Sequence, residues 1–173
     1  MKILITGIAA TGKSTIVKAL NERGIAAIDL HYVPDLFFWQ DIKTKEKVEY
    51  TPVHSREWFD TVDRLCSIKK LKEIFAQHNN DVVMAGTTSG GNQNEFLSLF
   101  DKIILLQADP ETLTHRMKTR VNKSGYGKTQ AEQEDNIDWQ KEYDPLLISY
   151  GAIPVNTEGN LDDVVSKIIE IIR

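Results

Sequence analysis

Apolar residues in this chain form two patterns, short continuous runs and longer stretches in which they recur every three or four positions. Continuous runs of about four to eight residues predict buried strands, and the three-to-four spacing predicts helices with one buried face. Because the runs are separated by predicted helices, we expect a mainly parallel sheet with helices on both faces. Five runs predict strands, at residues 3–6, 25–29, 81–85, 102–107 and 152–155.

Capping residues support the predicted helices. The helix at 13–23 is followed by Gly24, a typical C-cap glycine. Asp109, Pro110 and Glu111 supply the N-cap, first-turn proline and first-turn acid of another helix start. Further helices are predicted at 55–76, at 94–100, from the end of the polar stretch 122–128 to about 150, and at 162–172.

Composition limits the class of protein before it indicates any chemistry. The 173 residues are enough for one domain with a real core, and 25 acidic against 21 basic residues give a net charge of −4. This balance argues against sequence-independent binding to nucleic acid or to anionic membranes. Cys66 is the only cysteine, so no internal disulfide forms, and no apolar run is long enough to span a bilayer. We expect a cytoplasmic monomer or homodimer with neither nucleic-acid nor membrane partners.

The segment from Gly7 to Thr15 has the spacing of a P-loop, G-x-x-x-x-G-K-[ST], between a predicted strand and a predicted helix. Glycines let the backbone curl so that N–H groups face phosphate oxygens, and the helix start adds its positive dipole end. Lys13 would neutralise the β- and γ-phosphates, and Ser14 would offer a hydroxyl to Mg²⁺. We therefore predict an ATP site that uses Mg²⁺. Its predicted residues are Gly7, Ala10, Thr11, Gly12, Lys13, Ser14 and Thr15.

Two other nucleotide-binding classes have partial signatures here, and both are disfavoured. Residues 122–125, Asn-Lys-Ser-Gly, are similar to the guanine-reading N-K-x-D of GTPases, but Gly125 replaces the aspartate. Residues 89–93 are similar to the signature of transporter ATPases, but no acidic pair ends the next predicted strand.

The remaining motifs resemble the P-loop small-molecule kinases of the nucleoside-monophosphate kinase and shikimate kinase group, which includes gluconate-type and nucleoside kinases. The loop ending at 12–15, Gly-Lys-Ser-Thr, is similar to those of shikimate, gluconate and cytidylate kinases. Asp29 follows the second strand, where shikimate kinases carry Asp-x-Asp, but His31 takes the second place. Gly90 and Gly91 follow the third strand, where the family has a glycine run, and 103–120 is similar to the family's lid-entry strand and helix.

This resemblance implies a three-layer α/β P-loop NTPase fold with a five-stranded parallel sheet. It implies one kinase domain over residues 1–173, with an acceptor-binding insertion at about 32–78 and a short lid at about 121–130. The implied activity is ATP- and Mg²⁺-dependent transfer of a phosphoryl group to a small acceptor. Lys123, Tyr126 and Lys128 give the expected lid its basic and aromatic character.

Candidate catalytic residues are Lys13, Asp29, Arg116 and Arg120. Arg116 and Arg120 are four residues apart, so they share a predicted helix face and could clamp a transferring phosphoryl group, or form a solvated basic face. Asp29, at the carboxyl end of a parallel strand, is the candidate general base or, with Ser14, a metal ligand.

The acceptor is the least determined part of the prediction. Candidate acceptor-binding residues are Asp29, Arg56, Gly90 and Gly91. Aromatic residues could stack on a planar base, which favours a nucleoside or nucleotide acceptor, or could simply belong to the core. A shikimate-like or gluconate-like alcohol is the second interpretation, and a nucleotide-binding regulatory protein with weak ATPase activity is the third. The aromatic residues are Phe37, Phe38, Trp39 and Trp58.

Overall fold

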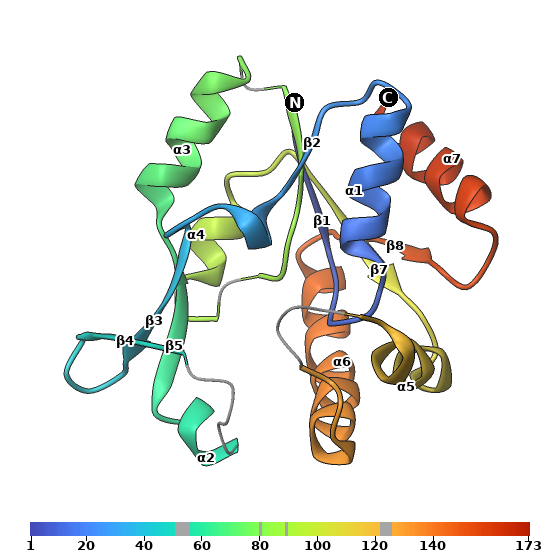
Figure 1. Ribbon diagram of the computed structural model, residues 1–173. Helices are drawn as coiled ribbons and strands as arrows, with labels where there is room; N and C mark the ends of the chain where they lie inside the picture. The colour runs from blue at the N-terminus through green and yellow to red at the C-terminus, as the bar shows by residue number, and fades with distance from the viewer. Residues whose placement is uncertain (51–55, 80, 89, 122–125) are drawn as a thin grey trace.

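A five-stranded parallel sheet forms the centre of the molecule (Figure 1). The computed structural model describes residues 1–50, 56–79, 81–88, 90–121 and 126–173. Each adjacent pair of strands in the sheet runs parallel. The strands lie side by side in the order β2 (Ala27–Asp29), β6 (Val82–Ala85), β1 (Lys2–Thr6), β7 (Lys102–Gln107) and β8 (Ile153–Asn156).

Helices cover both faces of this sheet, and the sheet separates two large apolar clusters of the core. Leu4 belongs to one apolar cluster, and its neighbours Ile3 and Ile5 belong to the other, as expected for alternating strand residues. The Ile3 side packs against α1 (Lys13–Glu22) and α7 (Leu161–Ile172). The Leu4 side packs against α3 (Ile68–Gln77), α4 (Gln93–Leu97) and the end of α6 (Gln130–Ser149).

The predicted fold class is confirmed. All five predicted strands are present, with ends displaced by at most two residues. Strands β1, β6 and β7 are buried on both faces, which explains why the sequence shows them as uninterrupted apolar runs.

A second, antiparallel sheet lies beside the first and was not predicted. It has the order β4 (Lys47–Val48), β3 (Phe37–Asp41) and β5 (Val62–Cys66), with Trp39 opposite Arg64. In Figure 1 it projects on the side of the central sheet away from α1 and α7. In the sequence, the short helix η1 (Leu30–Tyr32) precedes this sheet, and the short helix α2 (Arg56–Phe59) lies between β4 and β5. This sheet falls within the expected insertion at about 32–78.

The prediction of one helix over 55–76 is wrong. That range contains the short helix α2, strand β5 and nearly all of helix α3, whereas 51–55 lie outside the described residues. Val62 and Cys66, the buried ends of β5, are four residues apart, a spacing that fits two strand repeats as well as one helical turn. The three-to-four spacing therefore continued through a strand.

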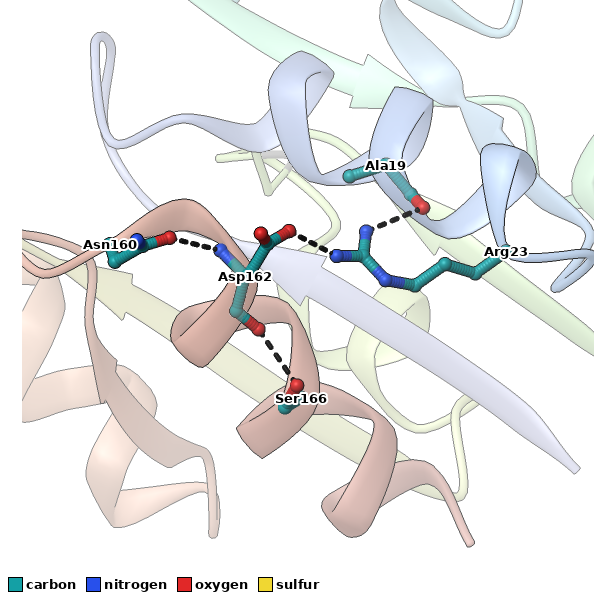
Figure 2. Close-up of polar contacts among 5 residues, drawn as sticks. All are labelled: Ala19, Arg23, Asn160, Asp162 and Ser166. Atoms are coloured by element: carbon teal, nitrogen blue, oxygen red, sulfur yellow. Dashed lines mark hydrogen bonds and ion pairs between the residues drawn. The ribbon is translucent and has the colours of Figure 1, made fainter.

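Helix α7 is fixed to the C-terminal end of α1 by a cluster of polar contacts (Figure 2). The Arg23 guanidinium donates to the carboxylate of Asp162 and to the carbonyl of Ala19, the latter at 3.1 Å. Asn160 caps α7 by accepting from the Asp162 amide at 2.8 Å. Because the Asp162 side chain is largely exposed, we expect this ion pair to contribute at most about 1 kcal/mol to stability.

Among the described residues, no helix is both long enough and apolar enough to cross a membrane.

Candidate functional site

The loop between β1 and α1 has the backbone geometry of an anion-binding site. Gly7 has φ +143, and a Cβ there would lie 2.6 Å from the carbonyl oxygen of Leu106, so only glycine fits between the loop and β7. Gly12 is the N-cap of α1, and Thr11 is buried, with its hydroxyl donating to the Ile8 carbonyl at 2.9 Å. The loop therefore ends at a helix N-terminus, whose free N–H groups favour phosphate.

Ala10 is the strained residue of this loop. Its φ of +67 lies in the left-handed region, which costs a non-glycine residue about 1 kcal/mol or more. Side chains from two helices hydrogen-bond to the main chain of Ala10 and of the residue before it. Arg116 donates to the Ala10 carbonyl at 3.4 Å, and Asn136 hydrogen-bonds to Ala9.

Lys13 lies in the first turn of α1 and folds back over the loop. Its ammonium donates to the carbonyl oxygens of Gly7 and Ile8, both at 2.7 Å. Burial lowers the pKa of Lys13 from 10.5 to about 8; nearby Asp29 opposes this, and the positive charges of Arg120 and Arg64 add to it. The predicted phosphate-binding lysine therefore lies close to Asp29 and to two arginines.

The lowered pKa of Lys13 predicts that nucleotide affinity depends on pH. A bound polyphosphate favours the charged lysine, so affinity is greatest below pH 8 and falls as the free lysine loses its proton. Between pH 7 and 9 we expect the Kd for Mg-ATP to rise about tenfold. Titration of a fluorescent ATP analogue across this range measures it. In Lys13→Met this dependence should vanish, and a flat profile in the native protein would contradict the prediction.

Ser14 and Asp29 bring two oxygen ligands together. The Ser14 hydroxyl donates to Asp29 Oδ2 at 2.6 Å, and Asp29 Oδ1 accepts from the His31 amide at 3.0 Å, which caps η1. Mg²⁺ is commonly held by one or two protein oxygens together with phosphates and water, so this pair fits that ion. Among the described residues, no group of three or more His, Cys, Asp or Glu side chains could hold a metal by itself.

Arg64, on β5, is a candidate site residue that the sequence analysis missed. Its guanidinium stacks over the Phe37 ring, 4.1 Å from the centroid, and donates to Thr87 Oγ1 and, at 3.4 Å, to the Thr88 carbonyl. Burial lowers the pKa of Arg64 to about 10, and no acidic group within the described ranges forms an ion pair with it. A buried cation of this kind is suited to an anionic ligand. Since 62–66 was interpreted as helix, no sequence signal pointed to it.

Gly90 and Gly91 lie next to this arginine, and they contact it through main-chain hydrogen bonds. Both amides donate to the Arg64 carbonyl, at 3.0 and 3.2 Å. The Asn92 side chain then accepts from the Cys66 amide and donates to the Cys66 carbonyl, both at 2.9 Å. The segment 90–92 therefore binds β5 as a further strand would, and it fixes the position of Arg64.

We expect Gly91→Ala to be destabilising and Gly90→Ala to be nearly neutral. A Cβ at Gly91 would lie 2.7 Å from Leu65 Cδ2 and 2.8 Å from Asp63 Cβ, whereas one at Gly90 would meet no atom within 4 Å. Forcing the segment away from β5 should cost about 1–3 kcal/mol. Urea unfolding of the two variants measures the difference, and equal midpoints would contradict this packing role.

The two arginines of the predicted pair, Arg116 and Arg120, make separate contacts. Arg116 donates to Thr157 Oγ1 at 3.0 Å and to its carbonyl at 2.7 Å, besides the Ala10 contact. Arg120 is the C-cap of α5 (Pro110–Thr119) and donates to the Tyr126 carbonyl at 3.0 Å. Its buried Nε has no hydrogen-bond partner among the described atoms. The two guanidiniums thus have separate surroundings, and Arg120 keeps an unused donor.

The described part of the expected lid is anchored to the two adjoining helices. Lys128 donates to the carbonyls of Met117 and Lys118, each at 3.1 Å, so it caps the end of α5. Glu132 Oε2 accepts from the amides of Gly127 and Lys128, each at 3.1 Å. Residues 122–125, with Lys123, lie outside the described part of the chain.

The other predicted acceptor-binding residues are an arginine and a group of aromatic residues. Arg56 begins α2, and its side chain lies outside the described part of the structure. Trp39 packs against Trp58 and Phe59 with centroids 5.2 and 5.6 Å apart, and Phe59 packs against Trp139 of α6 at 5.6 Å. We name these residues, with Tyr50, the junction cluster; Tyr50 stacks on Trp39 at 5.8 Å. Of the predicted aromatic residues, Phe37 lies against the guanidinium of Arg64, and Trp39 is opposite Arg64 in the sheet.

Comparison with known proteins gives both a family and a set of similar folds. Residues 3–138 match the family described as AAA domain. A shikimate kinase from Bacteroides thetaiotaomicron is 19% identical with a TM-score of 0.55, covering 99% of this chain and 97% of that one. A deoxyadenosine kinase from M. mycoides with bound dATP is 17% identical with a TM-score of 0.51, covering 99% and 98%.

A gluconokinase from Sinorhizobium meliloti is similar to the same degree. It is 14% identical with a TM-score of 0.52, covering 99% of this chain and 90% of that chain. No curated protein sequence gives a significant match. The family match places the chain in the AAA domain family, and the solved structures show that it shares the fold of small-molecule kinases, as the motifs predict.

Proposed function

The chain belongs to the AAA domain family, and from that premise we propose that it is a phosphotransferase that moves the γ-phosphoryl group of ATP to a small acceptor. The observation that carries the proposal is the grouping of Lys13, the Ser14–Asp29 pair and Arg64 at one end of the parallel sheet. A protein that only binds nucleotide needs the loop and its lysine. It has no need of a buried arginine beside them that forms no ion pair within the described residues.

In the proposed reaction, an acceptor oxygen, either a hydroxyl or a phosphate oxygen of a nucleoside monophosphate, forms a bond to the γ-phosphorus while the bond from that phosphorus to the β–γ bridging oxygen breaks, leaving ADP. Asp29 orients a hydroxyl acceptor and accepts its proton, whereas an ionised phosphate oxygen has no proton to lose. Lys13 and Arg120 stabilise negative charge on the transferred group, with Arg120 offering the Nε donor that has no partner among the described atoms. Arg116 acts through the loop, because it holds the Ala10 carbonyl.

Ser14 would hold Mg²⁺, with Asp29 as an outer-shell partner through its contact with the Ser14 hydroxyl. The ion, when bound, neutralises phosphate charge. ATP and a small acceptor are the expected partners.

For the acceptor, we propose a nucleotide or a nucleoside, with a shikimate-like or gluconate-like alcohol as the alternative. Arg64 favours an acceptor that carries an anionic group, and its stacking partner Phe37 presents an aromatic ring at the same place. Both features suit a nucleoside monophosphate, and a carboxylated alcohol would use the arginine alone. The names of the similar kinases cover both kinds of acceptor.

The test is ATP consumption with Mg²⁺ across a panel of nucleosides, nucleoside monophosphates and hydroxy acids. We expect ATP to be consumed only when one class of acceptor is present, with one phosphorylated product formed for each ATP consumed. Hydrolysis of ATP that no acceptor stimulates would overturn it and favour a regulatory nucleotide-binding protein.

A further inference from the structure

The long helix α6 presents a polar inner face to the rest of the molecule. Gln133 and Asn136 are buried, with Gln133 donating to the Gly127 carbonyl at 3.0 Å. Further along the helix, Gln140 donates to the Ala108 carbonyl at 3.0 Å, and Asp144 accepts from Gln107 at 2.8 Å. Because these contacts are hydrogen bonds, α6 shows little apolar periodicity although it is packed against the sheet.

One of these contacts reaches the phosphate loop directly. Asn136 Oδ1 accepts from the Ala9 amide at 3.1 Å, and its Nδ2 donates to the Ala9 carbonyl at 3.2 Å. The Asn136 side chain is 1% exposed, so water does not compete for these bonds. One carboxamide therefore satisfies both main-chain groups of a loop residue, as a neighbouring strand would.

The position of this contact matters because Ala10 is the strained residue of the loop. Asn136 holds the residue before it, and Arg116 holds its carbonyl from the other side. An unfavourable backbone conformation persists only where surrounding contacts fix it. The loop amides that receive phosphate depend on this conformation for their direction.

We propose that Asn136 is a positioning residue for the phosphate loop: its two hydrogen bonds to Ala9 keep the loop in the conformation that receives the phosphates of ATP. The inference rests on the proposed function for its effect on transfer, but its effect on nucleotide binding stands apart from any acceptor. At neutral pH the carboxamides of Asn and Gln carry a donor and an acceptor side by side, whereas an ionised acid has no donor and an aliphatic residue has neither, so neither can replace both bonds.

The chain uses the same device at a second place. Asn92 binds the amide and carbonyl of Cys66 in the same two-point manner. Asn92 joins the segment 90–92 to β5, whereas Asn136 joins α6 to the phosphate loop.

The experiment compares Asn136→Ala with Gln140→Ala. The second variant also removes a hydrogen bond from a carboxamide of α6, but that bond goes to the Ala108 carbonyl, just after β7, and not to the phosphate loop. For each variant, the Kd for Mg-ATP is measured without acceptor, and kcat and KM with the acceptor found in the panel. We expect Asn136→Ala to raise the Kd about tenfold, the loss of two hydrogen bonds, with a matching rise in KM for ATP. KM for the acceptor should not change, and Gln140→Ala should bind Mg-ATP as the native protein does.

Asn136→Asp provides a second variant of the same size. In its ionised form it keeps the acceptor for the Ala9 amide but lacks the donor to the Ala9 carbonyl, so it should weaken Mg-ATP binding relative to the native protein at a pH where the carboxyl is ionised. If Asn136→Ala does not fold, the test uses Asn136→Asp, and a native-like melting temperature shows that Asn136→Asp is folded. Native Mg-ATP affinity in a folded Asn136 variant, or equal weakening in Gln140→Ala, would overturn the inference. Failure of transfer in the native protein despite tight ATP binding would instead overturn the proposed function.

Discussion

Lys13→Ala should abolish phosphoryl transfer to every acceptor, with kcat falling by at least about a thousandfold. The ammonium of Lys13 is held at the loop by two carbonyl oxygens, 2.7 Å from each, and alanine leaves both the loop and the γ-phosphate without that charge. A charge fixed in a site of low dielectric is worth about 3–4 kcal/mol or more to the transition state. Steady-state assays with saturating acceptor measure the loss.

The control for this variant is Lys18→Ala. Lys18 lies on the same helix, but its side chain is 79% exposed and forms an ion pair with Glu22 at 3.8 Å on the surface of α1. Removing it should leave kcat and the Kd for Mg-ATP unchanged. Undiminished turnover in Lys13→Ala would contradict both the assignment of this loop and the proposed reaction.

Arg64→Met should raise the acceptor KM by two to three orders of magnitude while leaving the Kd for Mg-ATP within about threefold. Methionine keeps much of the apolar contact with Phe37 but removes the buried charge. Leaving an anionic group without its buried partner costs about 3–5 kcal/mol. The prediction is specific to anionic acceptors, since an uncharged one has little to lose.

Lys47→Met is the matched control for the arginine. Its ammonium lies over the ring of Phe38, 4.6 Å from the centroid, so the variant removes a cation stacked on an aromatic ring in the same sheet. KM for the acceptor should be unaffected there. If both variants change the acceptor KM equally, net charge and not a specific contact explains the result.

Local sequence signals predicted the phosphate loop and the parallel sheet well. Each central strand is a continuous apolar run because both faces are buried, and the glycines around Lys13 meet backbone demands within a few residues. Such features depend on near neighbours in the chain, so the sequence displays them.

The missed features depend on partners that are distant in the sequence. Arg64 became visible only when 62–66 proved to be a strand facing Phe37 and Thr87. Asn136 reaches Ala9 across 127 residues, and nothing in its own neighbourhood marks it. Likewise, Lys128 resembles a lid cation in the sequence, yet its ammonium caps α5.

The junction cluster makes the molecule its own optical probe. All three tryptophans of the chain, Trp39, Trp58 and Trp139, belong to it. Their emission therefore samples the place where the second sheet meets α6, and Trp139 also packs against the apolar cluster that contains Ile8 of the phosphate loop. Any shift of the second sheet against α6 should change the emission spectrum. An unlabelled sample in a fluorometer can thus report a rearrangement at the edge of the acceptor-binding insertion.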